Sequence, residues 1–216
     1  MVRKYCNTKN KTLSVLIYLY FHMTPEHYVY SSIDNICLEL NLSTKSHGAR
    51  RNQNVIKDIL KDLESQNIIR FDDRNFGGNI DELNNNQLFK IEINVQATLL
   101  NPSSNYVYVD ITEYQAIMKS PKYTYKVFNV FCQIKSHVCM DNNCLHICYP
   151  SIKTLCKLCG CSDDTLFSLL KIMYYNQLLY VYRLEQNEID LIKQNIEYVF
   201  ALEKYDRDAI LNEFIA

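Results

Sequence analysis

The sequence lacks the patterns on which membrane proteins and most familiar enzyme classes depend. It contains four Gly, four Pro and no Trp, and it has no Gly-rich phosphate loop, Walker lysine motif, nucleophile elbow or His-Glu zinc motif. No run of about 18 apolar residues occurs, so no transmembrane helix is expected. The initial Met-Val-Arg-Lys is not followed directly by an apolar signal core. We therefore expect a cytoplasmic protein that is not an enzyme and has neither a small-molecule substrate nor a membrane partner.

Composition and charge point to a folded chain with a polyanionic partner. Apolar residues make up 48% of the 216 residues, which is enough for one large or two small domains. The net charge of −1 conceals an asymmetry. Residues 1–61 hold nine Lys and Arg against four Asp and Glu, whereas residues 184–216 hold three against eight. The basic N-terminal region suits a polyanion such as DNA, and the acidic C-terminal region does not.

The nine cysteines, an odd number, indicate reduced thiols rather than a disulfide framework. Two groups have the residue types of a zinc site, namely Cys156, Cys159 and Cys161, and Cys139, Cys144, His146 and Cys148. The first group occupies core positions of the helical motif described below, where Cys acts as a small buried hydrophobe. The second group has no such explanation and remains a metal candidate, although we expect no cofactor.

The seventeen Tyr could include a nucleophile for DNA nicking. Enzymes of that kind need a His cluster that holds a metal, and the sequence has no such cluster at a useful spacing. We therefore expect the Tyr to be packing residues with one polar end.

Residues 150–183 form the most informative segment. The spacing predicts a short helix over 151–159, a tight turn at Gly160 and a second helix that Ser162 caps and Asn176 ends. The inward positions of the second helix are Leu166, Leu169, Leu170 and Met173. Residues 178–183 are β-prone. This is the order of a helix-turn-helix followed by a wing.

A weaker copy of the same order lies upstream. Helices are expected over 12–23, 32–40 and 52–67, and strands over 68–71 and 87–95, with a large mobile wing tip at 72–86. Asn41 can replace Gly in the left-handed turn. The next apolar pair arrives late, which implies an insertion over 43–51 before the second helix of this copy.

The best domain boundary is the polar segment 98–105. After it we expect a strand over 106–110, helices over 112–118 and 123–138, a short strand over 147–149 and a final amphipathic helix over 187–205. The fold class is mainly α with small β wings (α+β). Its two tandem winged-helix domains cover 1–100, the basic DNA-binding domain, and 101–216, which includes the C-terminal helix.

The second motif resembles the bacterial helix-turn-helix pattern. The resemblance rests on a small residue in the fifth place, Gly in the ninth and apolar residues in five further places, which here are Cys156, Gly160, Leu155, Cys159, Cys161, Leu166 and Leu169. Two winged helices joined by a short linker look like the initiator proteins of plasmid and phage replication. That resemblance implies site-specific binding to repeated duplex DNA sites, with one domain also able to mediate a homodimer.

The residues expected to contact DNA lie around the start of the second helix of the first domain and at the base of its wing. Arg can pair with guanine, Asn or Gln with adenine, and the remaining cations with phosphate. The set is Lys45, His47, Arg50, Arg51, Asn52, Gln53, Asn54, Lys57, Arg70 and Arg74.

The second domain is expected to contribute less to DNA affinity, although its motif is the better match. Its leading solvent-facing residues would include two carboxylates that repel phosphate and an aromatic ring that suits a protein contact. This interaction set is Asp163, Asp164, Phe167 and Ser168.

The sequence therefore predicts a site-specific duplex DNA-binding protein, first as a replication initiator of a plasmid or phage-type element. A transcription regulator on the same scaffold is the nearest alternative. An adaptor that uses winged helices to join proteins is the alternative of a different class.

Overall fold

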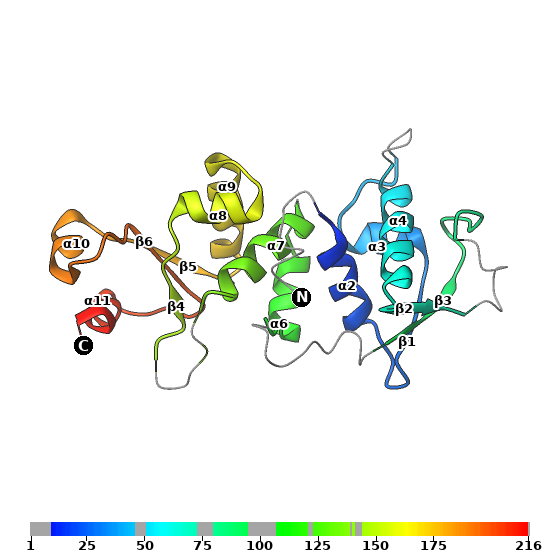
Figure 1. Cartoon of the computed structure of the whole chain (residues 1–216), viewed down its shortest axis with the longest axis horizontal. Helices are drawn as coiled ribbons and strands as arrows, with labels where there is room; N and C mark the ends of the chain where they lie inside the picture. The colour runs from blue at the N-terminus through cyan, green and yellow to red at the C-terminus, as the bar shows by residue number, and fades with distance from the viewer. Residues whose placement is uncertain are drawn as a thin grey trace. The chain divides into compact units, whose positions relative to one another are not determined.

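The chain forms two compact units, shown in Figure 1. The computed structural model describes residues 10–45, 51–72, 80–94, 107–120, 123–138, 140 and 144–215. Unit 1 contains the described residues of 11–94 and 123–125, and unit 2 contains residue 10 and the described residues of 107–120 and 126–215. Across these described ranges, no helix is both long and apolar enough to cross a membrane.

Unit 1 has the element order expected of a winged helix, with one strand more than the sequence indicated. The elements are α2 (Thr12–Phe21), β1 (Tyr28–Ser31), α3 (Ile33–Glu39), α4 (Asn52–Ser65), β2 (Ile69–Phe71) and β3 (Phe89–Ile93). The antiparallel sheet has the strand order β1-β3-β2, so β3 is central. The missed strand β1 pairs Val29 with Ile91.

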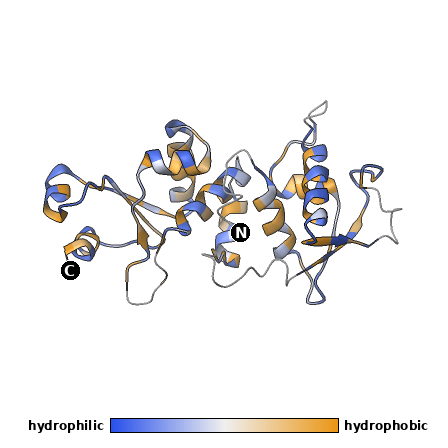
Figure 2. Cartoon of the chain, in the orientation of Figure 1, coloured by the Kyte–Doolittle hydropathy of each residue, from blue (hydrophilic) through white to orange (hydrophobic). Residues whose placement is uncertain are grey.

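The core of unit 1 follows from two periodicities. Phe89, Ile91 and Ile93 alternate along β3 and are buried, while Lys90 and Glu92 point to the other face. On α4 the buried apolar residues recur at helical spacing, as Ile56, Ile59, Leu60 and Leu63. Figure 2 shows hydrophobic residues along most of α2, whereas hydrophobic and hydrophilic residues alternate along α4. Helices α2 and α3 both contact α4, so the three helices cover one another's apolar faces.

Unit 2 repeats this order and adds three helices. The elements are α6 (Ile111–Met118), α7 (Thr124–Lys135), β4 (Ile147–Cys148), α8 (Ile152–Cys159), α9 (Asp163–Tyr175), β5 (Tyr180–Arg183), α10 (Gln186–Ile192), β6 (Tyr198–Ala201) and α11 (Arg207–Ile215). Its sheet order β4-β6-β5 matches that of unit 1. Helix α10 lies inside the wing, between β5 and β6, and α11 follows the last strand (Figure 1).

Two expectations for this half of the chain were wrong. Residues 187–205 are not one amphipathic helix, because Lys193 takes a left-handed conformation after α10 and β6 follows. The apolar residues Ile192, Ile196 and Val199 are buried in one small core. They belong to a helix, a loop and a strand, respectively. Residues 107–110 form no strand, because Asp110 caps α6 in a capping box with Glu113.

The two units are structural repeats at the level of single residues. Ser32 and Ser151 each cap the first helix of the motif. The backbone N–H of Leu42 donates to the carbonyl of Cys37, and that of Cys161 donates to Cys156, in the same geometry. At the far end, Ile68 N–H donates to Leu63 and Leu178 N–H to Met173. These matching bonds align α4 with α9 residue by residue. In that alignment, Lys57 of α4 corresponds to Phe167 of α9.

An ion pair holds the elaborated second wing together. The Arg207 guanidinium donates to both carboxylate oxygens of Glu188 and to the carbonyl of Arg183. The hydrogen bonds from Arg207, and then the backbone N–H of Glu185, lower the pKa of Glu188 to about 2. Tyr182 and Tyr205 add a second connection, because the Tyr182 hydroxyl donates to the Tyr205 carbonyl.

This ion pair predicts a specific acid sensitivity. The pKa of Glu188 is about 2 in the folded chain and about 4.5 ordinarily. The stabilisation is therefore complete above pH 4.5 and disappears as the pH falls toward 2. The difference in unfolding free energy between wild type and Glu188→Gln, measured by urea titration, should shrink across that interval. Glu213→Gln, on exposed α11, controls for the removal of one carboxylate, and equal profiles for the two variants would contradict the role of Glu188.

Candidate nucleic-acid interface

Both units contain the turn that a helix-turn-helix requires. Asn41 in unit 1 has φ 51° and Gly160 in unit 2 has φ 63°, so the left-handed residues predicted at both turns are confirmed. Ser162 caps α9 and Asn176 ends it, as the sequence indicated. Unit 1 differs in its linker, because nine residues, 43–51, stand between Leu42 and α4.

The two second helices begin in opposite chemical settings. Arg51 occupies the N-cap position of α4, and its side chain makes no capping hydrogen bond. In α9 the Ser162 hydroxyl accepts from Thr165 N–H, and Asp163 and Asp164 lie in the first turn. A helix N-terminus attracts anions through its N–H groups and its dipole. The start of α4 therefore suits phosphate, while that of α9 already has its own carboxylates.

Four of the predicted DNA-contacting residues of unit 1 lie in the linker before α4 or at the start of that helix. Lys45 and Asn54 are exposed, and Arg51 and Asn52 are half-buried at the start of α4. The Asn52 amide donates to the Ser43 carbonyl at 2.8 Å, which ties the linker to the helix. The predicted contacts that lie outside the described residues are His47, Arg50 and Arg74.

Gln53 and Lys57 are buried, although the sequence predicted both among the residues that contact DNA. Gln53 is 4% exposed, and its amide donates to Asp34 at 3.2 Å and to the Thr44 carbonyl at 3.1 Å. Lys57 is 9% exposed, and its ammonium donates to the carbonyls of Leu83 at 2.6 Å and Asp81 at 3.3 Å. The hydrophobic pattern of α4 could not show this, because the partners of Gln53 come from α3 and the linker and those of Lys57 come from the wing.

The described part of the wing of unit 1 packs on its own helices. Ile80 and Leu83 are buried. Asp34 N–H donates to the Asn85 carbonyl at 2.9 Å. Residues 80–85 are thus anchored, although a mobile tip was expected over 72–86. At the base of the wing, Arg70 pairs with Glu92 on the adjacent strand, so a phosphate would have to compete with a carboxylate for it.

The outer face of α4 beyond its first turn is acidic. Asp58 and Asp62 are exposed at the spacing of one helical turn. Lys61, on the same side, pairs with Asp81. Among the described residues, the charges that suit a phosphate are therefore Arg51 at the N-terminal end of α4 and Lys45 before it.

The predicted interaction residues of unit 2 all lie on the outer face of α9. Asp163, Asp164, Phe167 and Ser168 are exposed. The Ser168 hydroxyl donates back to the Asp164 carbonyl at 2.8 Å. Phe167 lies beside Tyr198 of β6, with ring centroids 6.0 Å apart. The interaction set predicted from the sequence did not include the neighbouring Tyr of this face, although Phe167 and Tyr174 stand two helical turns apart.

The cysteines do not supply a metal site within the described residues. No group of three or more His, Cys, Asp or Glu is placed there to hold an ion. Cys139, one of the candidate ligands, is not among the described residues. Burial raises the pKa of Cys148 to about 12 and that of Cys156 to about 12, so both thiols stay protonated at neutral pH.

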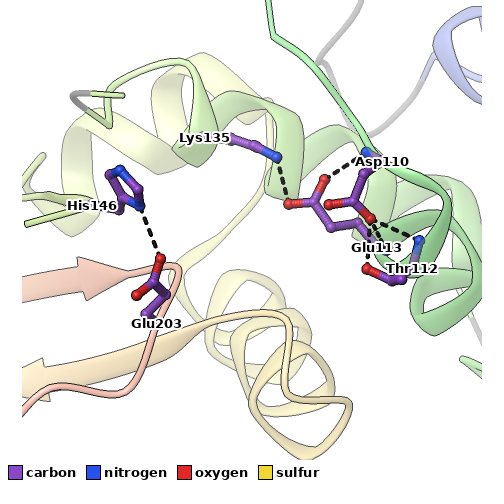
Figure 3. A network of polar contacts seen from close by, with 6 residues as sticks. All are labelled: Asp110, Thr112, Glu113, Lys135, His146 and Glu203. Carbon is purple, nitrogen blue, oxygen red and sulfur yellow. Dashed lines mark hydrogen bonds and ion pairs between the residues drawn. The ribbon is translucent and has the colours of Figure 1, made fainter. Parts of the chain in front are cut away.

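A cleft of about 610 Å³ lies in unit 2 and is a further concave candidate. Its wall carries the ion pair of Lys135 with Glu113 and the contact of His146 with Glu203, drawn in Figure 3. Asp110 caps α6 at the same place. The charged groups drawn are thus engaged within the protein, and the Thr112 hydroxyl donates to the Asp110 carboxylate at 2.6 Å as part of the same helix cap.

The helix-turn-helix of unit 2 is also recognised at the level of sequence families. Residues 126–172 match the family model of a helix-turn-helix domain. The matched range begins in α7, includes α8 and the turn, and ends within α9. This match supports DNA binding, because such domains place their second helix in the major groove. No curated protein and no solved structure matches the chain.

The assignment of Lys57 to the protein interior predicts a stability effect. Lys57→Met should lower the unfolding free energy by about 1–3 kcal/mol, since two wing carbonyls are deprived of a charged donor. Lys61→Met, one turn later on the same helix, removes an exposed ion pair and should cost about 1 kcal/mol or less. Urea denaturation measures both. Equal small decreases would return Lys57 to the candidate DNA contacts.

Proposed function

We propose that this protein binds duplex DNA site-specifically through unit 1, without catalysing a reaction. The observation that carries the proposal is the start of α4, where Arg51 occupies the N-cap position and its side chain makes no capping hydrogen bond. Exposed Lys45 lies in the linker just before it. This arrangement combines a helix N-terminus with cations at the place where a helix-turn-helix approaches the DNA backbone.

The charge distribution and the family match support the same conclusion. Residues 1–61 carry nine Lys and Arg against four Asp and Glu. Unit 2 matches a helix-turn-helix family, and unit 1 shares its turn, its element order and its sheet order. DNA affinity of this kind is dominated by phosphate contacts and falls with salt. A cytoplasmic location is part of the proposal.

Replication initiation at a plasmid or phage-type element is the first choice of process. Two units of the same fold in one chain favour it, because the initiators that the sequence resembles also carry two tandem winged helices. A transcription regulator is the second choice. Selection of bound sequences from a random duplex pool discriminates between them. Directly repeated sites support an initiator, and a single inverted repeat supports a dimeric regulator.

The first mutational test concerns the basic approach to α4. Lys45→Ala with Arg51→Ala should weaken duplex binding and flatten the log-log salt dependence by about one unit for each phosphate that is no longer neutralised. Adding Arg50→Ala tests the third cation of the segment. Fluorescence anisotropy across a salt series measures both the affinity and its salt dependence.

The control for this test is Lys204→Ala, an exposed cation in the acidic C-terminal region of unit 2. It should leave the affinity unchanged. A wild-type protein that binds random duplex weakly at every salt concentration would instead support the adaptor role and contradict DNA binding.

The acidic outer face of α4 gives an independent prediction. Asp58→Asn with Asp62→Asn should raise duplex affinity several-fold at low salt, because two carboxylates no longer repel phosphate. The increase should shrink as salt screens the charges. Asp208→Asn with Glu213→Asn on α11 removes the same charge from unit 2 and serves as the control. A decrease in affinity would show that a carboxylate accepts from a cytosine amino group.

A further inference from the structure

An aromatic surface covers the outer face of unit 2 around α9. We define it as Phe167, Tyr174, Tyr175, Tyr180 and Tyr198. Three of its members on α9 are well exposed, with fractions of 41% for Phe167, 52% for Tyr174 and 69% for Tyr175. The rings contact one another in pairs, with centroids 6.0 Å apart for Phe167 and Tyr198 and 6.1 Å apart for Tyr174 and Tyr180.

The aromatic surface differs from the equivalent face of unit 1. In unit 1, Lys57 stands in the place of Phe167 and is buried beneath wing residues. In unit 2, the ring that the wing places beside Phe167 is Tyr198. Exposed aromatic side chains gathered on one helix are enriched in the cores of protein interfaces and are depleted on free surfaces. This face therefore has the composition of a protein interface.

The charges along α9 indicate what covers it. Asp163 and Asp164 lie in the first turn. Lys171 lies about 10–12 Å further along, at 1.5 Å per residue, on the same exposed side. A helix that is negative at one end and positive past its middle is complementary to itself when a second copy runs antiparallel. Lys171 of each copy then lies within one turn of Asp164 of the other.

We infer that the aromatic surface joins two copies of this chain about a two-fold axis that crosses α9 between Phe167 and Lys171. Such an interface is self-complementary, because each copy presents the same residues to the other. The antiparallel arrangement also opposes the two helix dipoles favourably. Duplex DNA fits this surface less well, because Asp163 and Asp164 would meet phosphates at the leading end of the helix.

Sedimentation velocity of the full chain over a concentration series tests the interface. Wild type should form a dimer, and Phe167→Ser with Tyr174→Ser should raise the dimer dissociation constant by about tenfold or more. Leu191→Ser on α10 removes an exposed apolar side chain outside the aromatic surface and should change it by about twofold or less. A wild type that stays monomeric at every concentration overturns the proposal.

A charge exchange tests the two-fold arrangement without touching the aromatic rings. Lys171→Glu and Asp164→Lys should each weaken the dimer, since each places like charges opposite one another. The two changes in one chain should restore the dimer, because the axis brings the inverted charges together again. A combined variant no stronger than the single variants overturns the antiparallel pairing.

A DNA assay separates this inference from the proposed function. Lys45→Ala with Arg51→Ala should bind duplex more weakly and keep the dimer. Phe167→Ser with Tyr174→Ser should keep the affinity of the monomer for a duplex with a single half-site. A fall in that monomer affinity would assign the aromatic surface to DNA and overturn self-association. Unchanged affinity of the Lys45 and Arg51 variant would affect the proposed function alone.

Discussion

The architecture of both units depends on one left-handed residue that ends the first helix of the motif. At Asn41 and Gly160 the chain takes positive φ, and the residue after each donates its N–H back to a helix carbonyl five positions earlier. That bond satisfies the end of the helix while the chain reverses direction. A side chain that disfavours the left-handed region costs roughly 1–2 kcal/mol at such a position. The second helix of each motif can pack on the first only because this reversal is made.

The same buried positions leave the outer faces of the two second helices free to diverge. Ile56, Leu60 and Leu63 of α4 are matched by Leu166, Leu170 and Met173 of α9. Outside these positions α4 follows Arg51 at its N-cap position and continues with exposed Asp58 and Asp62, while α9 starts with carboxylates and continues with aromatic rings. One packing scheme therefore supports two surfaces of different chemistry, and function has to be argued from the surfaces.

The wings have diverged in a related way. In unit 1 the described wing segment is held down by Lys57, whose ammonium reaches two carbonyls. In unit 2 the wing contains α10, and Arg207 of α11 clamps it through Glu188. Each wing thus uses a cation that the sequence presents as an ordinary surface charge. In both cases, the cation satisfies acceptors and adds to the apolar residues that each wing buries.

Local features of this protein could be predicted from its sequence. The cap Ser162, the turns at Asn41 and Gly160 and the buried stripes of α4 and α9 follow from short-range sterics and from helical periodicity. Which polar residues remain available depends instead on long-range packing. Gln53 and Lys57 are covered by segments distant in the sequence, and the apolar residues of 187–205 are divided among a helix, a loop and a strand. The spacing of apolar residues is the same whether one helix or several elements contribute them to a core. A lysine is expected to be exposed from its sequence alone, and only the tertiary structure shows whether another segment covers it.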